Sequence, residues 1–135
     1  MAKKPTPEGQ LQVAVLAYLA ATGYGQNAWR QYTGPTIRGG GARRPILAPN
    51  PNKGIPDIFV ISLRFPGILF TFELKSIKGV CSPEQKIWHA RLRAAGVRCA
   101  VIRSLDEFKT TLAQFEEEAF ACCRETGQIP TSKSS

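Results

Sequence analysis

Apolar residues follow two patterns along the chain, the spacing of a helix and the short runs of a strand, and together they predict helices that cover a small sheet. The apolar positions Leu11, Val15 and Leu19 recur at helical spacing and predict a helix over Pro7–Ala21. A short strand is expected next, around Ala28–Thr33. The chain therefore opens with a helix followed by a strand.

The middle of the chain contains two apolar runs, Ile58–Ile61 and Ile68–Phe72, on either side of Pro66 and Gly67. Pro-Gly is a turn signal, and two apolar runs around a tight turn are typical of an antiparallel hairpin. We therefore expect a hairpin over Asp57–Lys75.

Capping patterns divide the rest of the chain. Ser82–Gln85 has the S-x-x-Q form of a capping box, so it predicts a helix that ends at Gly96. Val97–Arg103 has the weak alternation of a strand, and Ser104–Glu107 is a second capping box opening a helix to about Arg124. The apolar stripe of this last helix consists of Leu105, Phe108, Leu112, Phe115 and Ala119. The order αβββαβα predicts an α/β fold, a mixed sheet flanked by helices.

A length of 135 residues is sufficient for one domain. We expect that domain to span residues 1–125, with residues 126–135 forming a polar, flexible tail. The sequence has no run of eighteen apolar residues, so no membrane contact is expected. The basic start Met1–Lys4 is not followed by a signal-type apolar stretch, which predicts a cytoplasmic location.

Charge is distributed unevenly around a net value of +8. Residues 9–104 contain thirteen Lys and Arg but three acids, whereas residues 105–125 contain six acids and two bases. A basic body of this kind favours a polyanionic partner. The acidic run Glu116–Glu118 is expected to be the solvated face of the last helix.

The spacing of Asp57 and Glu73 is the feature most informative about chemistry. The two acids are sixteen positions apart, and their midpoint falls within two residues of the expected turn. Both should therefore lie near the open end of the hairpin, opposite each other, with Lys75 on the strand face of Glu73. Two carboxylates suit Mg²⁺, and a neighbouring lysine can orient a water. These residues predict a nuclease site.

An exposed ion pair is the alternative explanation, since E-x-K is common on solvated strand faces. However, Asp57 and Glu73 are two of the three acids between Gly9 and Ser104, and both border apolar runs. An acid beside buried strands requires a partner, a proton or a metal. The functional interpretation is therefore favoured.

The stretch Gly34–Gly54 is rich in Gly, Pro, Asn and Arg and predicts a long loop without regular structure. Glycines allow the backbone to approach a surface closely, and arginines bind phosphates through forked hydrogen bonds. We expect DNA contacts here and at nearby lysines; the residues are Arg38, Arg43, Arg44, Lys53 and Lys78. A basic surface loop without function is the alternative.

The remaining reactive residues carry weaker signals. The cysteines lack a C-x-x-C spacing and are expected to be free thiols; they are Cys81, Cys99, Cys122 and Cys123. His89, the only histidine, is expected to have a surface or packing role in mid-helix rather than a catalytic one. Trp29 and Tyr32 are expected in the core, with base stacking as the alternative.

Four segments at this spacing resemble the VRR-NUC domain, the virus-type replication-repair branch of the PD-(D/E)XK nucleases. They are Gly54–Asp57, Phe72–Lys75, Ser82–Trp88 and Leu92–Gly96, and the resemblance covers about residues 7–108. It implies a PD-(D/E)XK nuclease-like fold and a phosphodiesterase that uses Mg²⁺ or Mn²⁺.

The resemblance also implies a set of site residues. The metal would be held by Asp57, Glu73 and the backbone carbonyl of Leu74, with Lys75 completing the catalytic set. A further glutamate on the first helix is implied, and Glu8 is the only candidate. Capping of that helix explains Glu8 equally well, so its role stays open. Gln85 is explained by its capping box, with an accessory polar role at the site as a second use.

The expected function is a metal-dependent DNA endonuclease. The resemblance points to branched DNA such as the four-way Holliday junction, in DNA repair, and two symmetry-related cuts favour a homodimer. The alternatives are a flap-directed or non-specific nuclease acting as a monomer, an RNA-directed nuclease, and a catalytically silent DNA-binding module.

Overall fold

The computed structural model describes residues 4, 6–32, 36–39, 46–48 and 50–127. Its elements are α1 (Pro7–Ala21), the 3-10 turn η1 (Gly25–Asn27), β1 (Ala28–Arg30), β2 (Thr36–Arg38), β3 (Ile46–Ala48), β4 (Ile58–Ile61), β5 (Leu69–Leu74), α2 (Pro83–Ala94), β6 (Arg98–Ile102) and α3 (Leu105–Thr126). The expected tail lies outside the described residues from position 128 onward. None of the described helices is long and apolar enough to cross a membrane.

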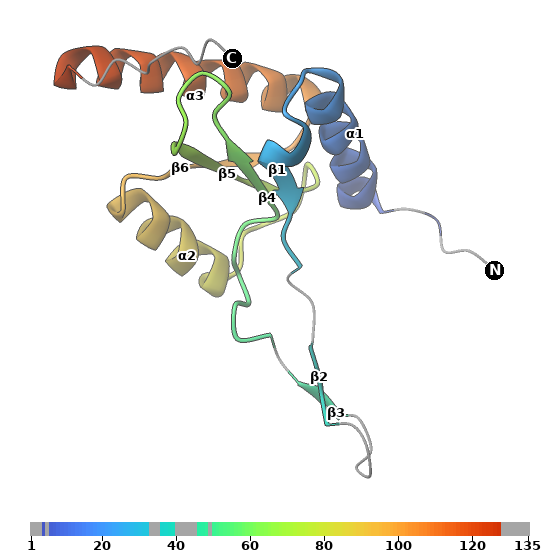
Figure 1. Ribbon diagram of the computed structural model, residues 1–135. Coiled ribbons are helices and arrows are strands. Elements are labelled where there is room, and N and C mark those ends of the chain that lie inside the picture. The colour runs from blue at the N-terminus through green and yellow to red at the C-terminus, as the bar shows by residue number, and fades with distance from the viewer. Residues whose placement is uncertain (1–3, 5, 33–35, 40–45, 49, 128–135) are drawn as a thin grey trace.

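Four strands form a mixed sheet in the order β1-β4-β5-β6. Strand β4 runs antiparallel to both β1 and β5, whereas β5 and β6 are parallel. Helices α1 and α3 cover one face of the sheet and α2 covers the other (Figure 1). The predicted α/β class, with helices flanking a mixed sheet, is therefore confirmed.

The core lies between the sheet and the pair α1 and α3. Alternate residues of β5 enter it, and the ring of Phe72 lies 4.8 Å from that of Phe108 and 5.5 Å from that of Phe115. Truncating one such buried ring typically costs about 3–5 kcal/mol. The intervening residues Thr71 and Glu73 are also buried, because α2 covers the opposite face. Strand β5 is thus enclosed on both sides.

Local capping explains where the first two helices begin. The Thr6 hydroxyl accepts a hydrogen bond from the Gly9 N–H at 3.0 Å, and Pro7 starts α1. At α2, the Ser82 hydroxyl accepts from the Gln85 N–H at 3.2 Å, and the Gln85 side chain accepts from the Ser82 N–H at 2.8 Å. Both starts are as the sequence predicted.

The start of α3 differs in one hydrogen bond from the expected capping box. The Ser104 hydroxyl accepts from the Glu107 N–H at 3.1 Å, as in such a box. The Glu107 carboxylate, however, accepts from the Arg103 N–H at 3.3 Å, one residue before the cap. The helix is still capped because both local N–H groups find acceptors.

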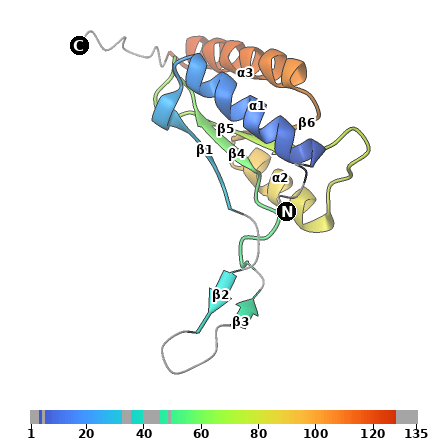
Figure 2. The same ribbon diagram turned by 90° about the vertical axis from the view of Figure 1, so that its right-hand side faces the viewer.

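The stretch Gly34–Gly54 was expected to lack regular structure, and this expectation is wrong. Strands β2 and β3 pair antiparallel, with Thr36 opposite Ala48. This two-stranded ribbon projects away from the body of the domain (Figures 1 and 2). Each strand has only three residues, too few to show an alternating pattern among the surrounding Gly and Pro.

Three residues lie in environments opposite to those expected. Trp29 is 38% exposed rather than in the core, because β1 is an edge strand, and Tyr32, two residues beyond the end of β1, is 56% exposed. Trp29 packs instead beside Phe59 of β4, with ring centroids 5.7 Å apart. Glu116 is 7% exposed rather than solvated, because its position on α3 faces the loop after β4.

Candidate active site

The hairpin register brings the two predicted acids together. Ile58 of β4 pairs with Phe72 of β5, so one position further along places Asp57 opposite Glu73. The Leu74 N–H donates to Asp57 Oδ2 at 2.9 Å, which fixes the half-buried aspartate against β5. The pairing expected from their spacing is therefore present in the structure.

Proline in the Gly-Ile-Pro-Asp segment has a physical role at this site. Continuing the register places Pro56 opposite Leu74, and Pro56 is fully buried there. Proline has no N–H, so it cannot donate to the Leu74 carbonyl as an ordinary strand partner would. The N–H and carbonyl of a strand residue point to the same side of the strand. Because the Leu74 N–H is bonded to Asp57, the Leu74 carbonyl also faces the Asp57 side.

Gly54 attaches the same segment to α2. Its φ of +93° lies in the left-handed region, and an added Cβ would lie 2.5 Å from the Glu84 carbonyl carbon and 2.8 Å from the Gln85 nitrogen. A side chain here would therefore strain the backbone and collide with the first turn of the helix. The loop that carries Asp57 is thus seated directly on α2.

Glu73 is the most unusual carboxyl group of the site. It is 1% exposed, and its side chain is hydrogen-bonded to Asp57. Burial raises the pKa of Glu73 to about 10, with the Asp57 hydrogen bond and charge adding to the effect and the Lys75 charge opposing it. The surroundings of Glu73 therefore favour its neutral form over the carboxylate.

Sequence reasoning gave His89 no catalytic role, yet the structure places it beside this carboxyl group. His89 is 4% exposed on α2, and its Nε2 lies 3.7 Å from Glu73 Oε1. Burial lowers the pKa of His89, and the charges of Arg93 and Lys75 lower it further. The sequence did contain one signal for this position. His89 lies one helical turn after Gln85, so both are on the face of α2 that starts against the Gly54–Asp57 segment.

Glu8 and Lys75 reach the same region from other elements. A pocket of about 310 Å³ is lined by Thr6, Glu8, Gly9, Gln12, Arg30, Asp57 and Leu74. Although Glu8 is exposed, its Oε1 accepts from the Ser76 N–H at 3.4 Å. A methyl group on Gly79 would lie 3.3 Å from both Glu8 Oε1 and Lys75 Cδ. The carboxylate of Glu8 therefore faces the candidate site rather than only capping α1.

The oxygen atoms assembled here fit a hard divalent cation. Asp57 and Glu73 lie opposite each other, and Asp57, Leu74 and Glu8 line the same pocket. No three acid, His or Cys side chains form a ready-made metal group in the described ranges. Mg²⁺ is typically bound by one or two carboxylates and keeps several waters, so the donor set suits it.

The basic residues expected to contact DNA are only partly described. The side chains of Arg38, Arg43 and Arg44 lie outside the described part of the structure. Lys53 is exposed and lies 3.9 Å from Glu84 at the start of α2, close to the Gly54 segment. Lys78 is exposed in the loop between β5 and α2. Gln85 uses its side-chain oxygen in the helix cap.

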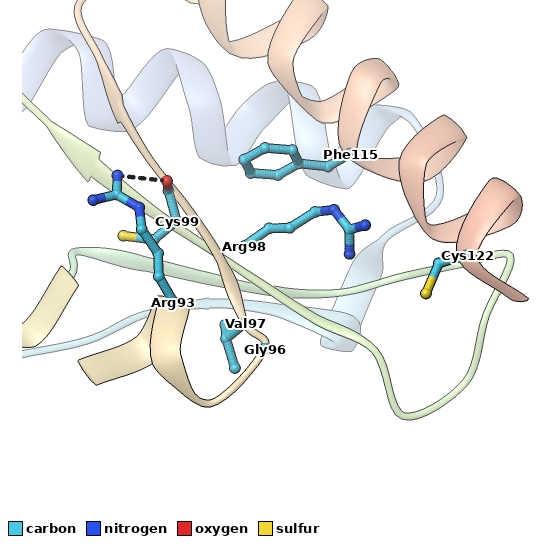
Figure 3. A pocket seen from close by; sticks show the side chains of 7 residues that line it. All are labelled: Arg93, Gly96, Val97, Arg98, Cys99, Phe115 and Cys122. Atoms are coloured by element: carbon cyan, nitrogen blue, oxygen red, sulfur yellow. Dashed lines mark hydrogen bonds between the residues drawn. The ribbon is translucent and has the colours of Figure 1, made fainter. Parts of the chain in front are cut away.

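A second pocket, of about 420 Å³, lies at the other end of β6 (Figure 3). It is lined by Arg93, Gly96, Val97, Arg98, Cys99, Phe115 and Cys122. Arg93 donates to the Cys99 carbonyl at 3.0 Å and Arg98 to Glu118 at 2.9 Å. Both guanidinium groups are thus held by the protein itself, and the pocket lies away from the acids.

Compared with protein-family models, curated proteins and solved structures, the chain gives no significant match. The resemblance to the VRR-NUC domain therefore rests on the sequence motifs and is not a family assignment. Function has to be argued from the geometry of the site.

Proposed function

We propose that this protein is a Mg²⁺- or Mn²⁺-dependent DNA endonuclease of the PD-(D/E)XK type. The observation that carries the proposal is Glu73, a fully buried carboxyl group that lies opposite Asp57 and leaves Oε1 without a hydrogen bond. A protein gains no stability from such an arrangement, whereas a cation-binding site requires it.

The remaining site residues have complementary roles in this mechanism. A divalent cation held by Asp57, Glu73 and the Leu74 carbonyl would polarise the phosphate and lower the pKa of a bound water. Lys75 orients that water or stabilises the charge that develops on the phosphate. Glu8, which lines the same pocket as Asp57, supplies a further oxygen from α1.

DNA is the substrate that the charge distribution favours. The body carries thirteen Lys and Arg against three acids between positions 9 and 104. The chain that leads from β1 toward the β2–β3 ribbon passes the site at Gln31, whose N–H donates to the Asp57 carbonyl at 2.7 Å. DNA whose phosphate lies at Asp57 would therefore lie beside Gln31, on the side from which the ribbon extends.

Branched DNA cut by a homodimer is the specific form that we propose. Incubation with labelled linear, flap and four-way DNA and with RNA, in Mg²⁺, Mn²⁺ or EDTA, tests the activity and its substrate. Light scattering gives the mass. We expect metal-dependent cutting of the four-way junction by a dimer, and a monomer that cuts linear DNA equally well would overturn the junction assignment.

The matched control for chemistry is an acid outside the site. Glu73→Gln should abolish cleavage, whereas Glu84→Gln removes a carboxylate that pairs with Lys53 at the start of α2 and should not. Cleavage that survives in EDTA, or in Glu73→Gln, would overturn the metal mechanism. Tight DNA binding by the wild-type protein without any cleavage would identify a DNA-binding module instead.

A further inference from the structure

We propose that His89 is a positioning residue for Glu73: its Nε2–H group holds Glu73 Oε1, which leaves the other carboxylate oxygen directed at Asp57 and the cation. This inference rests on the proposed metal-dependent function. It concerns how one ligand is held, and it assigns His89 no contact with substrate.

The two facing atoms are both unsatisfied. Among the described residues, Glu73 Oε1 and His89 Nε2 are the buried side-chain atoms that lack a hydrogen-bond partner. They lie 3.7 Å apart, beyond the usual hydrogen-bond distance of about 3 Å. Leaving a buried polar atom unpaired typically costs about 1–3 kcal/mol, so a small movement that joins these two removes both penalties.

Glu73 lies opposite Asp57 across the hairpin, whereas its Oε1 faces His89 and has no hydrogen-bond partner among the described residues. If Glu73 holds a cation through its other oxygen, this buried Oε1 requires a donor of its own. Carboxylates that bind metals are generally held by such a second hydrogen bond. His89 Nε2 is the nearby atom able to supply it.

A purely structural role for His89 is a weaker explanation. Helix α2 is already fixed by its capping box and by the Gly54 segment packed against its first turn. An apolar side chain of similar size would fill the same space without leaving Nε2 unpaired. If His89 served only for packing, a leucine at this position would therefore give a more stable fold.

The variants His89→Leu and His89→Gln test the proposal through metal affinity. Calorimetric titration with Mn²⁺ should show binding weakened about 10- to 100-fold in His89→Leu, and largely restored in His89→Gln because its amide can donate to Oε1. The melting temperature without metal should be unchanged or higher in His89→Leu. Lys86→Gln, on the exposed face of the same helix, is the control and should bind as the wild type does.

The single histidine of the chain provides a second readout that needs no substitution at position 89. In ¹⁵N spectra of the imidazole, Mg²⁺ should shift the Nε2 signal to that of a strongly hydrogen-bonded N–H. The shift should be absent in Glu73→Gln. If the wild type binds neither cation, the proposed function fails. If it binds both, but His89→Leu binds equally well or the Nε2 signal does not move, the positioning role is excluded.

Discussion

Two buried glutamates lie toward opposite ends of the sheet and have opposite surroundings. Glu116 of α3 accepts hydrogen bonds from the Tyr24 hydroxyl at 3.1 Å, the Ser62 hydroxyl at 2.6 Å and the Leu63 N–H at 3.3 Å. Glu73 of β5, in contrast, lies opposite another acid, Asp57, and has one oxygen without a donor. Strand β4 connects the two regions, since Asp57 precedes it and Ser62 follows it.

The difference separates two uses of a buried acid. The donors around Glu116 replace the water that it loses, so the carboxylate can connect α3, η1 and the β4–β5 turn. The surroundings of Glu73 favour its neutral form and leave capacity for a cation. A buried acid that is fully hydrogen-bonded indicates structure, whereas an incompletely satisfied pair of acids indicates a binding site.

The largest effect expected is on cleavage when Glu73 is changed. Glu73→Gln should lower the cleavage rate about a hundredfold or more, because the metal loses a ligand. Asp57→Asn and Lys75→Ala should do the same, but only the two carboxylate variants should weaken binding of Mn²⁺. Initial rates and calorimetry measure these effects. Equal activity of Glu73→Gln and the wild type would remove the distinction between the two glutamates.

The complementary change at Glu116 should affect stability instead. Glu116→Ala leaves Tyr24 and Ser62 without their acceptor and should lower the free energy of unfolding by about 3 kcal/mol. Urea unfolding measures this loss. Cleavage per folded molecule should be unchanged, and a large fall in that rate would mean that the two ends of the sheet are coupled.

The pH dependence of stability should distinguish the same two residues. The pKa of Glu73 rises from an ordinary 4.5 to about 10 on folding, so between these values the folded protein holds a proton that the unfolded chain has lost. The stabilisation is thus complete below the lower pKa and is lost as pH rises toward the upper one. Urea unfolding in EDTA from pH 5 to about pH 9 should show this decline.

Glu73→Gln is the control for the pH experiment, because it removes the titrating group. The decline should flatten in this variant but persist in Glu116→Gln. Saturating Mg²⁺ should also reduce it in the wild type, since the cation favours the ionised form. An identical decline in all variants would assign the effect to other groups.

The smallest effect tests the open side of the site. Gly79→Ala would place a methyl group 3.1 Å from Ser76 Oγ and 3.3 Å from both Glu8 Oε1 and Lys75 Cδ, closer than most such contacts. We expect cleavage to fall several-fold while the free energy of unfolding changes by less than about 0.5 kcal/mol. Gly67→Ala is the control in the turn between β4 and β5: its φ of +88° strains an alanine, so stability should fall, but cleavage per folded molecule should be unaffected. Full activity of Gly79→Ala would show that neither side chain is held tightly.

Sequence reasoning succeeded where the determining interactions are local. The bounds of α1 follow from the Thr6 cap and the helical spacing of Val15 and Leu19. The pairing of Asp57 with Glu73 follows from one hairpin turn, because the register on both sides of a turn is set by the residues within it.

The features that sequence reasoning missed depend on distant partners. Glu116 lies in a run of three acids, and nothing near it indicates that Tyr24 and Ser62 fold against it. His89 is likewise a lone histidine until α2 crosses the sheet and brings it to Glu73. Contacts between residues far apart in the chain are fixed by the assembled sheet and are not visible in local patterns.

The base of the β2–β3 ribbon has a consequence for how the protein could change. Arg30 is paired with Ile58, and Gln31 is hydrogen-bonded to Asp57, so the chain leaves and re-enters the domain through adjacent backbone atoms. Closing a loop across such a junction depends only weakly on its length. The ribbon can therefore be shortened or replaced by another sequence while the domain that carries the acids keeps its fold.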